Sequence, residues 1–338
     1  MNNFSRLIVN WYRLNKRSLP WREELNPYYI WLSEIILQQT KVDQGIPYYF
    51  KFVQKYPTII KLANVEEKEV LNDWQGLGYY SRARNLHYSA KHIRDKLNGE
   101  FPKNYNEILK LKGVGKYTAA AISSFAFNEK KAVVDGNVYR LLSRYFDIST
   151  PIDSSSGIKE FQEIADSLIN NENPGEHNQA IMEIGALICI PKKPKCTYCP
   201  LAEKCISFIK GNIQNRPIKK TRLKRKKRFF HYLIFNHNEE LIVEKRTKKD
   251  IWKNMYQFPL IEAKNIDEKI DLNMFKNKLF ESSIRKHILS HQIIYVKFHH
   301  FNSTYNFNKN CFKIKKSEIG NYPIPRIIDK YLEEQTLF

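Results

Sequence analysis

Four of the five cysteines in this chain lie within seventeen residues, and this cluster constrains the fold more than any other feature of the sequence. Cys189, Cys196, Cys199 and Cys205 have the spacing C-x6-C-x2-C-x5-C. Four thiolates so close together suit one shared centre, either a tetrahedral zinc ion or a [4Fe–4S] cubane. Structural zinc usually takes two tight C-x(2–4)-C pairs, and only Cys196 and Cys199 form one. The spacing therefore favours an iron–sulfur cluster, with zinc and a disulfide pair as the alternatives.

The composition predicts a globular protein with a polyanionic partner. Hydrophobic residues make up 42% of the 338 residues, enough for two domains, and no apolar run approaches the ~20 residues of a membrane span. The net charge of +21 favours nucleic acid, although part of the excess fits the composition of an AT-rich genome. No secretion signal is evident, so we expect a reducing compartment, with Cys311 an ordinary buried or idle thiol.

The hydrophobic pattern changes after the cysteine cluster. Apolar residues recur at helical spacing across most of residues 1–210. Residues 219–228 hold eight Lys or Arg in ten, which predicts a basic linker, either along phosphates or as a solvated tether. Two apolar runs then flank the turn at 236–238, as in a β-hairpin. We expect helices at 28–41, 65–74, 82–97, 105–110, 117–127, 157–169 and 324–334, and strands at 229–235, 241–243 and 293–298.

A glycine-rich turn lies between the expected helices 105–110 and 117–127. Gly113 and Gly115 allow the backbone to turn tightly and to approach a ligand closely. The amides that follow open a helix N-terminus, where an anion is favoured. This is the form of a helix-hairpin-helix, which holds DNA phosphates through backbone N–H groups without reading the base sequence.

The hairpin followed by the cysteine cluster resembles the endonuclease III superfamily of base-excision DNA glycosylases. The finer similarity is to the adenine DNA glycosylases of the MutY type, which remove adenine mispaired with 8-oxoguanine. It is carried by the segments 19–22 (LPWR), 31–40 (WLSEIILQQT), 76–86 (GLGYYSRARNL) and 135–138 (DGNV).

The resemblance implies a multidomain protein. An all-α helix-hairpin-helix glycosylase domain with an iron–sulfur cluster loop would be followed by a C-terminal α+β Nudix-like domain. The expected boundaries are 1–212 for the glycosylase domain (a six-helix module at about 28–130 with the hairpin at 105–127, and a cluster module of 1–27 and 131–212), 213–228 for the basic linker and 229–338 for the Nudix-like 8-oxoguanine recognition domain.

Two carboxylates carry the chemistry that the resemblance implies. Glu34 lies among large apolar residues, so its pKa should rise and suit a general acid near neutral pH. In the family, the matching glutamate protonates N7 of the flipped adenine. Asp135 reads on sequence alone as a turn or helix N-cap, but it matches the aspartate that stabilises the oxocarbenium-like transition state. Tyr117 and Asn137 match residues that position this aspartate and the nucleophilic water.

The resemblance also implies contacts with the DNA and the flipped base. Tyr79 would be the aromatic wedge of a minor-groove loop, and Gln39 would fill space around the flipped base. Some relatives carry a glutamate where Gln179 stands, and Leu289 replaces the phenylalanine of a Phe-Ser-His loop that reads 8-oxoguanine. A catalytic Nudix box is missing, so no pyrophosphatase activity is expected. The residues matched to substrate or DNA contacts are Arg22, Gln39, Leu77, Tyr79, Gly113, Gly115, Gln179, Leu289, Ser290 and His291.

We therefore predict a monofunctional adenine DNA glycosylase, a hydrolase of the N-glycosidic bond that flips out adenine opposite 8-oxoguanine or guanine in double-stranded DNA. It would carry a [4Fe–4S] cluster on the four cysteines and act as a monomer in the bacterial cytoplasm, at the nucleoid and away from membranes.

Two other functions are left open by the sequence. A bifunctional endonuclease III-like glycosylase and abasic-site lyase needs a lysine where Tyr117 stands, and Lys116 lies about 100° away around a helix. A lesion-binding or iron–sulfur redox protein would have no need for the pair Glu34 and Asp135.

Overall fold

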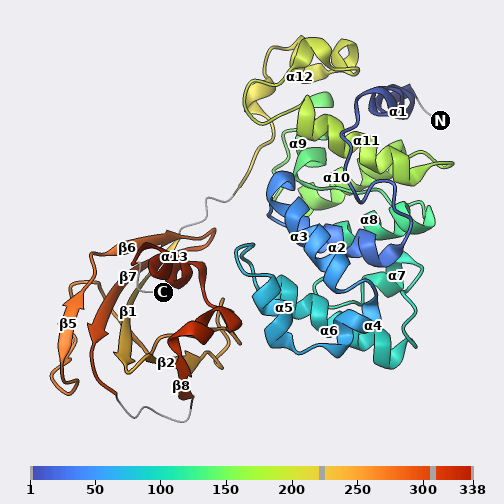
Figure 1. Ribbon diagram of the computed structural model, residues 1–338. Coiled ribbons are helices and arrows are strands. Elements are labelled where there is room, and N and C mark those ends of the chain that lie inside the picture. Colours follow the sequence, from blue (N-terminus) through green and yellow to red (C-terminus); the bar gives the residue numbers. More distant parts are fainter. Residues whose placement is uncertain (1–2, 221–224, 305–309, 336–338) are drawn as a thin grey trace. The chain divides into compact units, whose positions relative to one another are not determined.

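The computed structural model describes residues 3–220, 225–304 and 310–335, and its contacts divide the chain into two compact units (Figure 1). The first unit comprises residues 1–63 and 88–222, and the second comprises residues 64–87 and 223–338. The first unit is built from helices, and the second carries a mixed β-sheet. This confirms the expected fold class, while the expected domain boundaries stay a prediction.

Helices are present at all six places where the sequence of the first 210 residues predicts them. The N-cap Asn26, whose side chain accepts from the Tyr28 amide, starts the second helix, with Pro27 at its first position. The helices are α1 (Asn3–Asn15), α2 (Pro27–Leu37), α3 (Val42–Lys55), α4 (Ile59–Asn64), α5 (Glu67–Asp73), α6 (Ser81–Lys96), α7 (Tyr105–Ile108), α8 (Lys116–Phe127), α9 (Gly136–Tyr145), α10 (Ser155–Leu168), α11 (Pro174–Leu187) and α12 (Ile206–Ile209).

Six of the described helices lie outside the predicted ranges: α1, α3, α4, α9, α11 and α12. In α11, two glycines lower the helix propensity. Close packing requires both of them. A Cβ atom on Gly175 would lie 2.5 Å from the Ser124 carbonyl oxygen, and one on Gly185 would lie 2.7 Å from Cβ of Asn137. Both distances are far below van der Waals contact, so α11 approaches α8 and α9 too closely for any larger residue.

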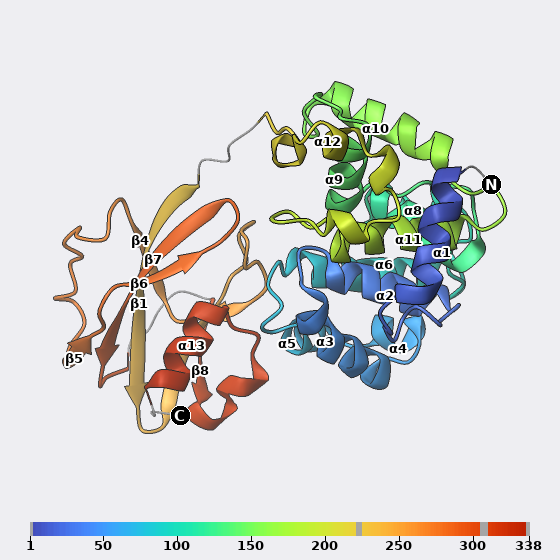
Figure 2. The ribbon, with the colours of Figure 1, turned by 90° about the horizontal axis from the view of Figure 1, so that it is seen from above.

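The core of the first unit surrounds α11, which contacts α1, α8 and α9 (Figures 1 and 2). Buried polar side chains fix this packing. Asn178 donates to Ser124 Oγ (2.9 Å) and to the Lys131 carbonyl (2.7 Å) and accepts from the Val133 amide (3.2 Å). Because α2 also packs on α8, side chains of α2, α8, α9 and α11 can meet at one site.

The second unit contains an eight-stranded mixed sheet within its described residues. β1 and β7 run parallel at its centre, and the other pairs are antiparallel. The predicted hairpin is confirmed, since Asn236 of β1 pairs with Leu241 of β2. The strands are β1 (Lys226–His237), β2 (Glu240–Lys245), β3 (Tyr256–Gln257), β4 (Leu260–Ala263), β5 (Lys278–Glu281), β6 (Arg285–Ile288), β7 (Gln292–Phe301) and β8 (Cys311–Lys315).

The predicted closing helix is α13 (Arg326–Glu334), which packs on the sheet. The Tyr331 ring stacks on Phe298 of β7 with ring centroids 3.8 Å apart, and its hydroxyl bonds His300 at 2.7 Å. β1 already begins at Lys226, inside the segment expected to be a linker. Residues 221–224 of that expected linker lie outside the described residues. None of the described helices combines the length and the apolar character that a membrane span requires.

Candidate active site

One pocket of the first unit collects seven of the predicted site residues. Its volume is about 550 Å³, within the range of small-molecule sites. Helices α2, α8, α9 and α11 and the segment after α1 supply its walls. The seven residues are Arg22, Glu34, Gln39, Tyr117, Asp135, Asn137 and Gln179.

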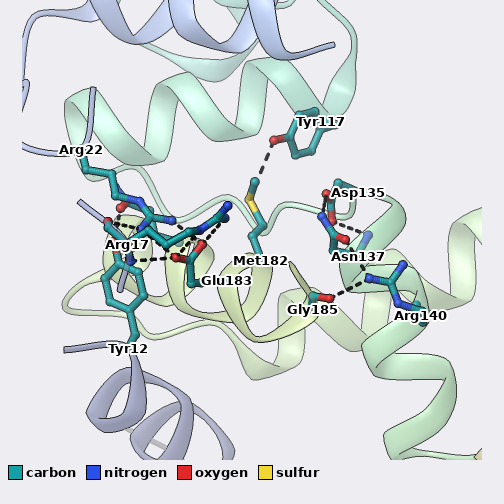
Figure 3. A network of polar contacts seen from close by, with 11 residues as sticks. Tyr12, Arg17, Arg22, Tyr117, Asp135, Asn137, Arg140, Met182, Glu183 and Gly185 are labelled. Atoms are coloured by element: carbon teal, nitrogen blue, oxygen red, sulfur yellow. Dashed lines mark hydrogen bonds and ion pairs between the residues drawn. The ribbon is translucent and has the colours of Figure 1, made fainter. Parts of the chain in front are cut away.

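Glu34 reaches the pocket from the apolar helix α2 and is 7% exposed. Burial raises the pKa of its carboxyl to about 7, although a hydrogen bond with Tyr117 opposes the shift; the nearby Asp135 charge adds to it. The Tyr117 hydroxyl also lies 3.8 Å from Met182 Sδ (Figure 3). A carboxyl with this pKa is substantially protonated near neutral pH and can donate that proton.

Asp135 is the N-cap of α9 and also faces the pocket. Its Oδ1 accepts from the amides of Asn137 (2.9 Å) and Val138 (2.8 Å), and its Oδ2 accepts from Asn137 Nδ2 (2.8 Å). Burial raises the pKa of Asp135, and the bonds from Val138 and Asn137 oppose that rise. The turn or N-cap interpretation is therefore confirmed, and Asp135 also lines the pocket that Glu34 enters.

Arg140 connects the start of α9 to the residues before the cysteine loop. Its Nη2 donates to Asn137 Oδ1 (2.8 Å) and to the Gly185 carbonyl (2.7 Å) (Figure 3). Its Nε donates to the Cys189 carbonyl (2.6 Å). Asn137 is thus fixed from both sides, which holds Asp135 in place. The sequence reasoning missed Arg140, although it lies one helical turn after Asn137.

A buried carboxylate at Glu183 binds Arg17 and Arg22, and all three line the pocket (Figure 3). On the same helix, one turn earlier, the Gln179 side chain accepts a hydrogen bond from the Tyr12 hydroxyl. Sequence reasoning found Arg22 and Gln179 but missed Tyr12, Arg17 and Glu183. The i, i+4 spacing of Gln179 and Glu183 was the available signal.

Seven predicted contact residues do not line this pocket. Gly113, with φ of +86°, and Gly115 form the turn between α7 and α8, so the predicted hairpin geometry is present. Tyr79 is 43% exposed with φ of +48°, in a loop of the second unit. The others in the second unit are Leu77, before α6, and Leu289, Ser290 and His291, in the turn between β6 and β7.

All four clustered cysteines line one cavity in the first unit. The buried Arg144 guanidinium donates to Cys189 Sγ at 3.4 Å and to the Ile190 carbonyl at 2.9 Å. Across residues 3–220, 225–304 and 310–335, no group of three or more His, Cys, Asp or Glu side chains is arranged to hold a metal ion. The cluster therefore stays a prediction at this point.

Comparison with known families defines the class of protein. Residues 32–166 match the family described as HhH-GPD superfamily base excision DNA repair protein, and residues 231–334 match the NUDIX domain. A solved structure described as a thermostable thymine-DNA glycosylase is 33% identical, with a TM-score of 0.57 over 61% of this chain and 95% of that one. An endonuclease III structure at 24% identity shares the fold, with a TM-score of 0.53.

Named relatives, of which the first matches over nearly its whole length, identify the family within this class. An adenine DNA glycosylase of Buchnera aphidicola subsp. Acyrthosiphon pisum is 36% identical over 98% of this chain and 97% of its own length. That of subsp. Baizongia pistaciae is 39% identical over 87% of this chain and 84% of its own length. The human adenine DNA glycosylase is 40% identical over 59% of this chain and 38% of its own. The chain belongs to the adenine DNA glycosylase family, of the MutY type.

Proposed function

We propose that this protein hydrolyses the glycosidic bond of adenine opposite 8-oxoguanine or guanine in duplex DNA, as a monofunctional glycosylase. The observation that carries this proposal is the pair of buried carboxylates, Glu34 and Asp135, in one pocket large enough for a nucleobase. The pKa of Glu34 is raised to about 7, while amide donors stabilise the charged form of Asp135. One proton donor and one anion are what glycosidic hydrolysis requires.

The proposed chemistry divides between the two carboxyls. Glu34 donates its proton to N7 of the extruded adenine, so the electron pair of the breaking C1′–N9 bond can leave with a neutral base. Asp135 stabilises the positive charge that develops at the sugar. A water molecule then adds to C1′, and its proton returns to the Glu34 carboxylate. Tyr117, which hydrogen-bonds Glu34, keeps that carboxyl aimed into the pocket.

Binding of double-stranded DNA is proposed from the hairpin and the charge. The turn at Gly113 and Gly115 precedes the N-terminus of α8, whose backbone N–H groups can donate hydrogen bonds to a phosphate. A net charge of +21 adds sequence-independent attraction. We assign the reading of 8-oxoguanine to the exposed Ser290 and His291, where Ser290 Oγ and His291 Nδ1 lie 3.1 Å apart. The proposed setting is a monomer in the bacterial cytoplasm, since the Buchnera relatives are bacterial.

The proposed cofactor is a [4Fe–4S] cluster held by Cys189, Cys196, Cys199 and Cys205. These residues fit the group because they line one largely apolar cavity, and the Arg144 guanidinium beside Cys189 can balance part of the thiolate charge. The cluster would supply structural cross-linking of the loop and no step of the hydrolysis.

The lyase alternative is disfavoured by the residue at position 117. A lyase needs an amine aimed at C1′. Position 117 instead holds a phenol that bonds Glu34, and Lys116 is exposed. The thymine-DNA glycosylase structure covers 61% of this chain and so does not account for all of it.

A single-turnover assay on a panel of duplexes tests the proposed function. The duplexes carry adenine opposite 8-oxoguanine, guanine or thymine, and thymine opposite guanine. We expect excision of adenine, fastest opposite 8-oxoguanine, and no release of thymine. Borohydride added to a parallel reaction should trap little protein on the DNA. Release of thymine alone, or stoichiometric trapping through a lysine, would contradict the assignment.

A further inference from the structure

The carboxylate of Glu183 is the most heavily bonded acidic group around the pocket. Its side chain is 1% exposed. It accepts five hydrogen bonds: three from the backbone amide (2.9 Å), Nε (2.9 Å) and Nη2 (2.7 Å) of Arg17, and two from Nη1 (2.9 Å) and Nη2 (2.5 Å) of Arg22. A buried carboxylate that binds two guanidinium groups in bidentate fashion fixes their orientation as well as their charge.

These bonds attach a short loop to α11. Arg22 Nη1 also donates to the Arg17 carbonyl at 2.7 Å, so the two arginines and Glu183 close a ring of contacts (Figure 3). Four residues of segment 17–22 line the pocket together with Glu183: Arg17, Leu19, Trp21 and Arg22. This wall of the pocket therefore has Glu183 as its anchor.

The ring of contacts leaves one edge of the Arg22 guanidinium available to an acceptor. Its Nη1 and one hydrogen of Nη2 bind Glu183 and Arg17. Within the described part of the chain, no acceptor bonds Arg22 Nε or the second hydrogen of Nη2. These two N–H groups are parallel and form a fork that suits an acceptor edge. The side chain is only 11% exposed, so the fork cannot rotate freely.

The Glu183 carboxyl stays negatively charged, so its ion pairs with Arg17 and Arg22 persist. Burial alone would raise the pKa of this carboxyl, but the hydrogen bonds from Arg17 and Arg22 outweigh burial and lower the pKa to about 2. It therefore stays ionised at every pH at which the protein is expected to act.

We propose that Glu183 is a positioning residue: it holds the Arg22 fork and the 17–22 loop as the wall against which the extruded base is seated. The proposal rests on the proposed function, because it presumes that a flipped adenine enters this pocket. It goes further in assigning to a residue outside the two catalytic carboxyls the task of keeping the base aligned with Glu34.

A second ion pair on the same helix provides a matched control. Glu176 lies seven residues before Glu183 on α11 and binds Arg13 through two bonds of 2.8 and 2.7 Å. Its partner Arg13 is 57% exposed, and neither residue lines the pocket. Both carboxylates attach α11 to the N-terminal segment, but only Glu183 and its arginines line the pocket.

The test compares Glu183→Gln, Glu176→Gln, Arg22→Met and the double variant Arg22→Met/Glu183→Gln in the full-length protein, on a duplex with adenine opposite 8-oxoguanine. Active-site titration gives the fraction of active protein, and single-turnover kinetics gives the rate constant of that fraction. We expect Glu183→Gln to lower the rate constant by about 10- to 100-fold, because a misplacement on the order of 1 Å costs this much. Glu176→Gln should keep the wild-type rate constant.

The double variant distinguishes a positioning role of Glu183 from a role in folding stability alone. Because Glu183 acts on the same wall as Arg22, the double variant should lose much less than the sum of the two single losses. A purely structural role would instead reduce the active fraction and leave its rate constant unchanged, which would overturn the proposal, as would fully additive losses. Should Glu183→Gln fail to fold, Glu183→Asp keeps the charge but retracts the carboxylate; a wild-type rate constant in that variant would also overturn it. If the proposed function itself were wrong, the wild-type protein would excise no adenine. That result differs from every outcome that overturns the role of Glu183.

Discussion

The variant Glu34→Gln is expected to lose adenine excision while it still binds the mismatched duplex. Glutamine has nearly the same shape as the protonated carboxyl, but it is not an acid of useful strength. Loss of a general acid typically costs about 10²- to 10⁴-fold in rate. Because Glu34 is buried beside Tyr117, the substitution leaves the surface that meets the DNA unchanged. Single-turnover kinetics and a gel-shift titration on the same duplex measure the two quantities separately.

The matched control for this prediction is Glu163→Gln. Glu163 lies on α10, its side chain is 67% exposed, and it pairs with Lys159 at 3.8 Å. Exposed pairs of this kind contribute little, so excision and binding should both equal those of the wild-type protein. Normal turnover by Glu34→Gln would remove the proposed acid and with it the mechanism given above.

The second large effect is expected from Cys199→Ser. If the four cysteines hold a cluster, removing one ligand releases or weakens it, and the loop between α11 and α12 loses its cross-link. We expect a visible absorbance band in the wild-type protein that is lost in the variant. We also expect a loss of at least about 2 kcal/mol of unfolding free energy, which is about 4–8 °C in melting temperature for a unit of this size.

Cys311→Ser is the control for the cysteine prediction. Cys311 lies on β8 in the second unit, half-buried and away from the four clustered residues in sequence. Replacing Cys311 should leave both the absorbance band and the melting temperature of the first unit unchanged. A Cys199→Ser protein that retains both properties would show that the cavity holds no cluster.

The raised pKa of Glu34 and the cap formed by Asp135 could be predicted from local signals, whereas their catalytic roles were inferred from the family resemblance. Glu34 lies in a helix whose neighbours are nearly all apolar, so a desolvated carboxyl follows directly from the pattern. Asp135 stands before Asn137 and Val138, whose amides it caps, and a cap is encoded within four residues. The structure agrees with both expectations and adds that the two side chains line the same pocket.

The residues that sequence reasoning missed depend on contacts far apart in the chain. Glu183 meets Arg17 across 166 positions, and its i, i+4 spacing from Gln179 places it on the pocket side of the helix without encoding that partner. Helix α11 was missed because Gly175 and Gly185 weaken its local signal, while their reason lies in neighbouring helices. In the second unit, the parallel pairing of β1 with β7 joins residues more than fifty positions apart, and the short strand β5 is exposed throughout.

The pH dependence of the single-turnover rate tests most directly whether a protonated Glu34 drives the reaction. The acid form is active, and its pKa is raised to about 7, so the rate should level off below that pH and fall about tenfold per unit above it. At low pH a second decline should appear as Asp135 takes up a proton. A rate constant that stays flat or rises between about pH 6 and pH 9 would contradict the account.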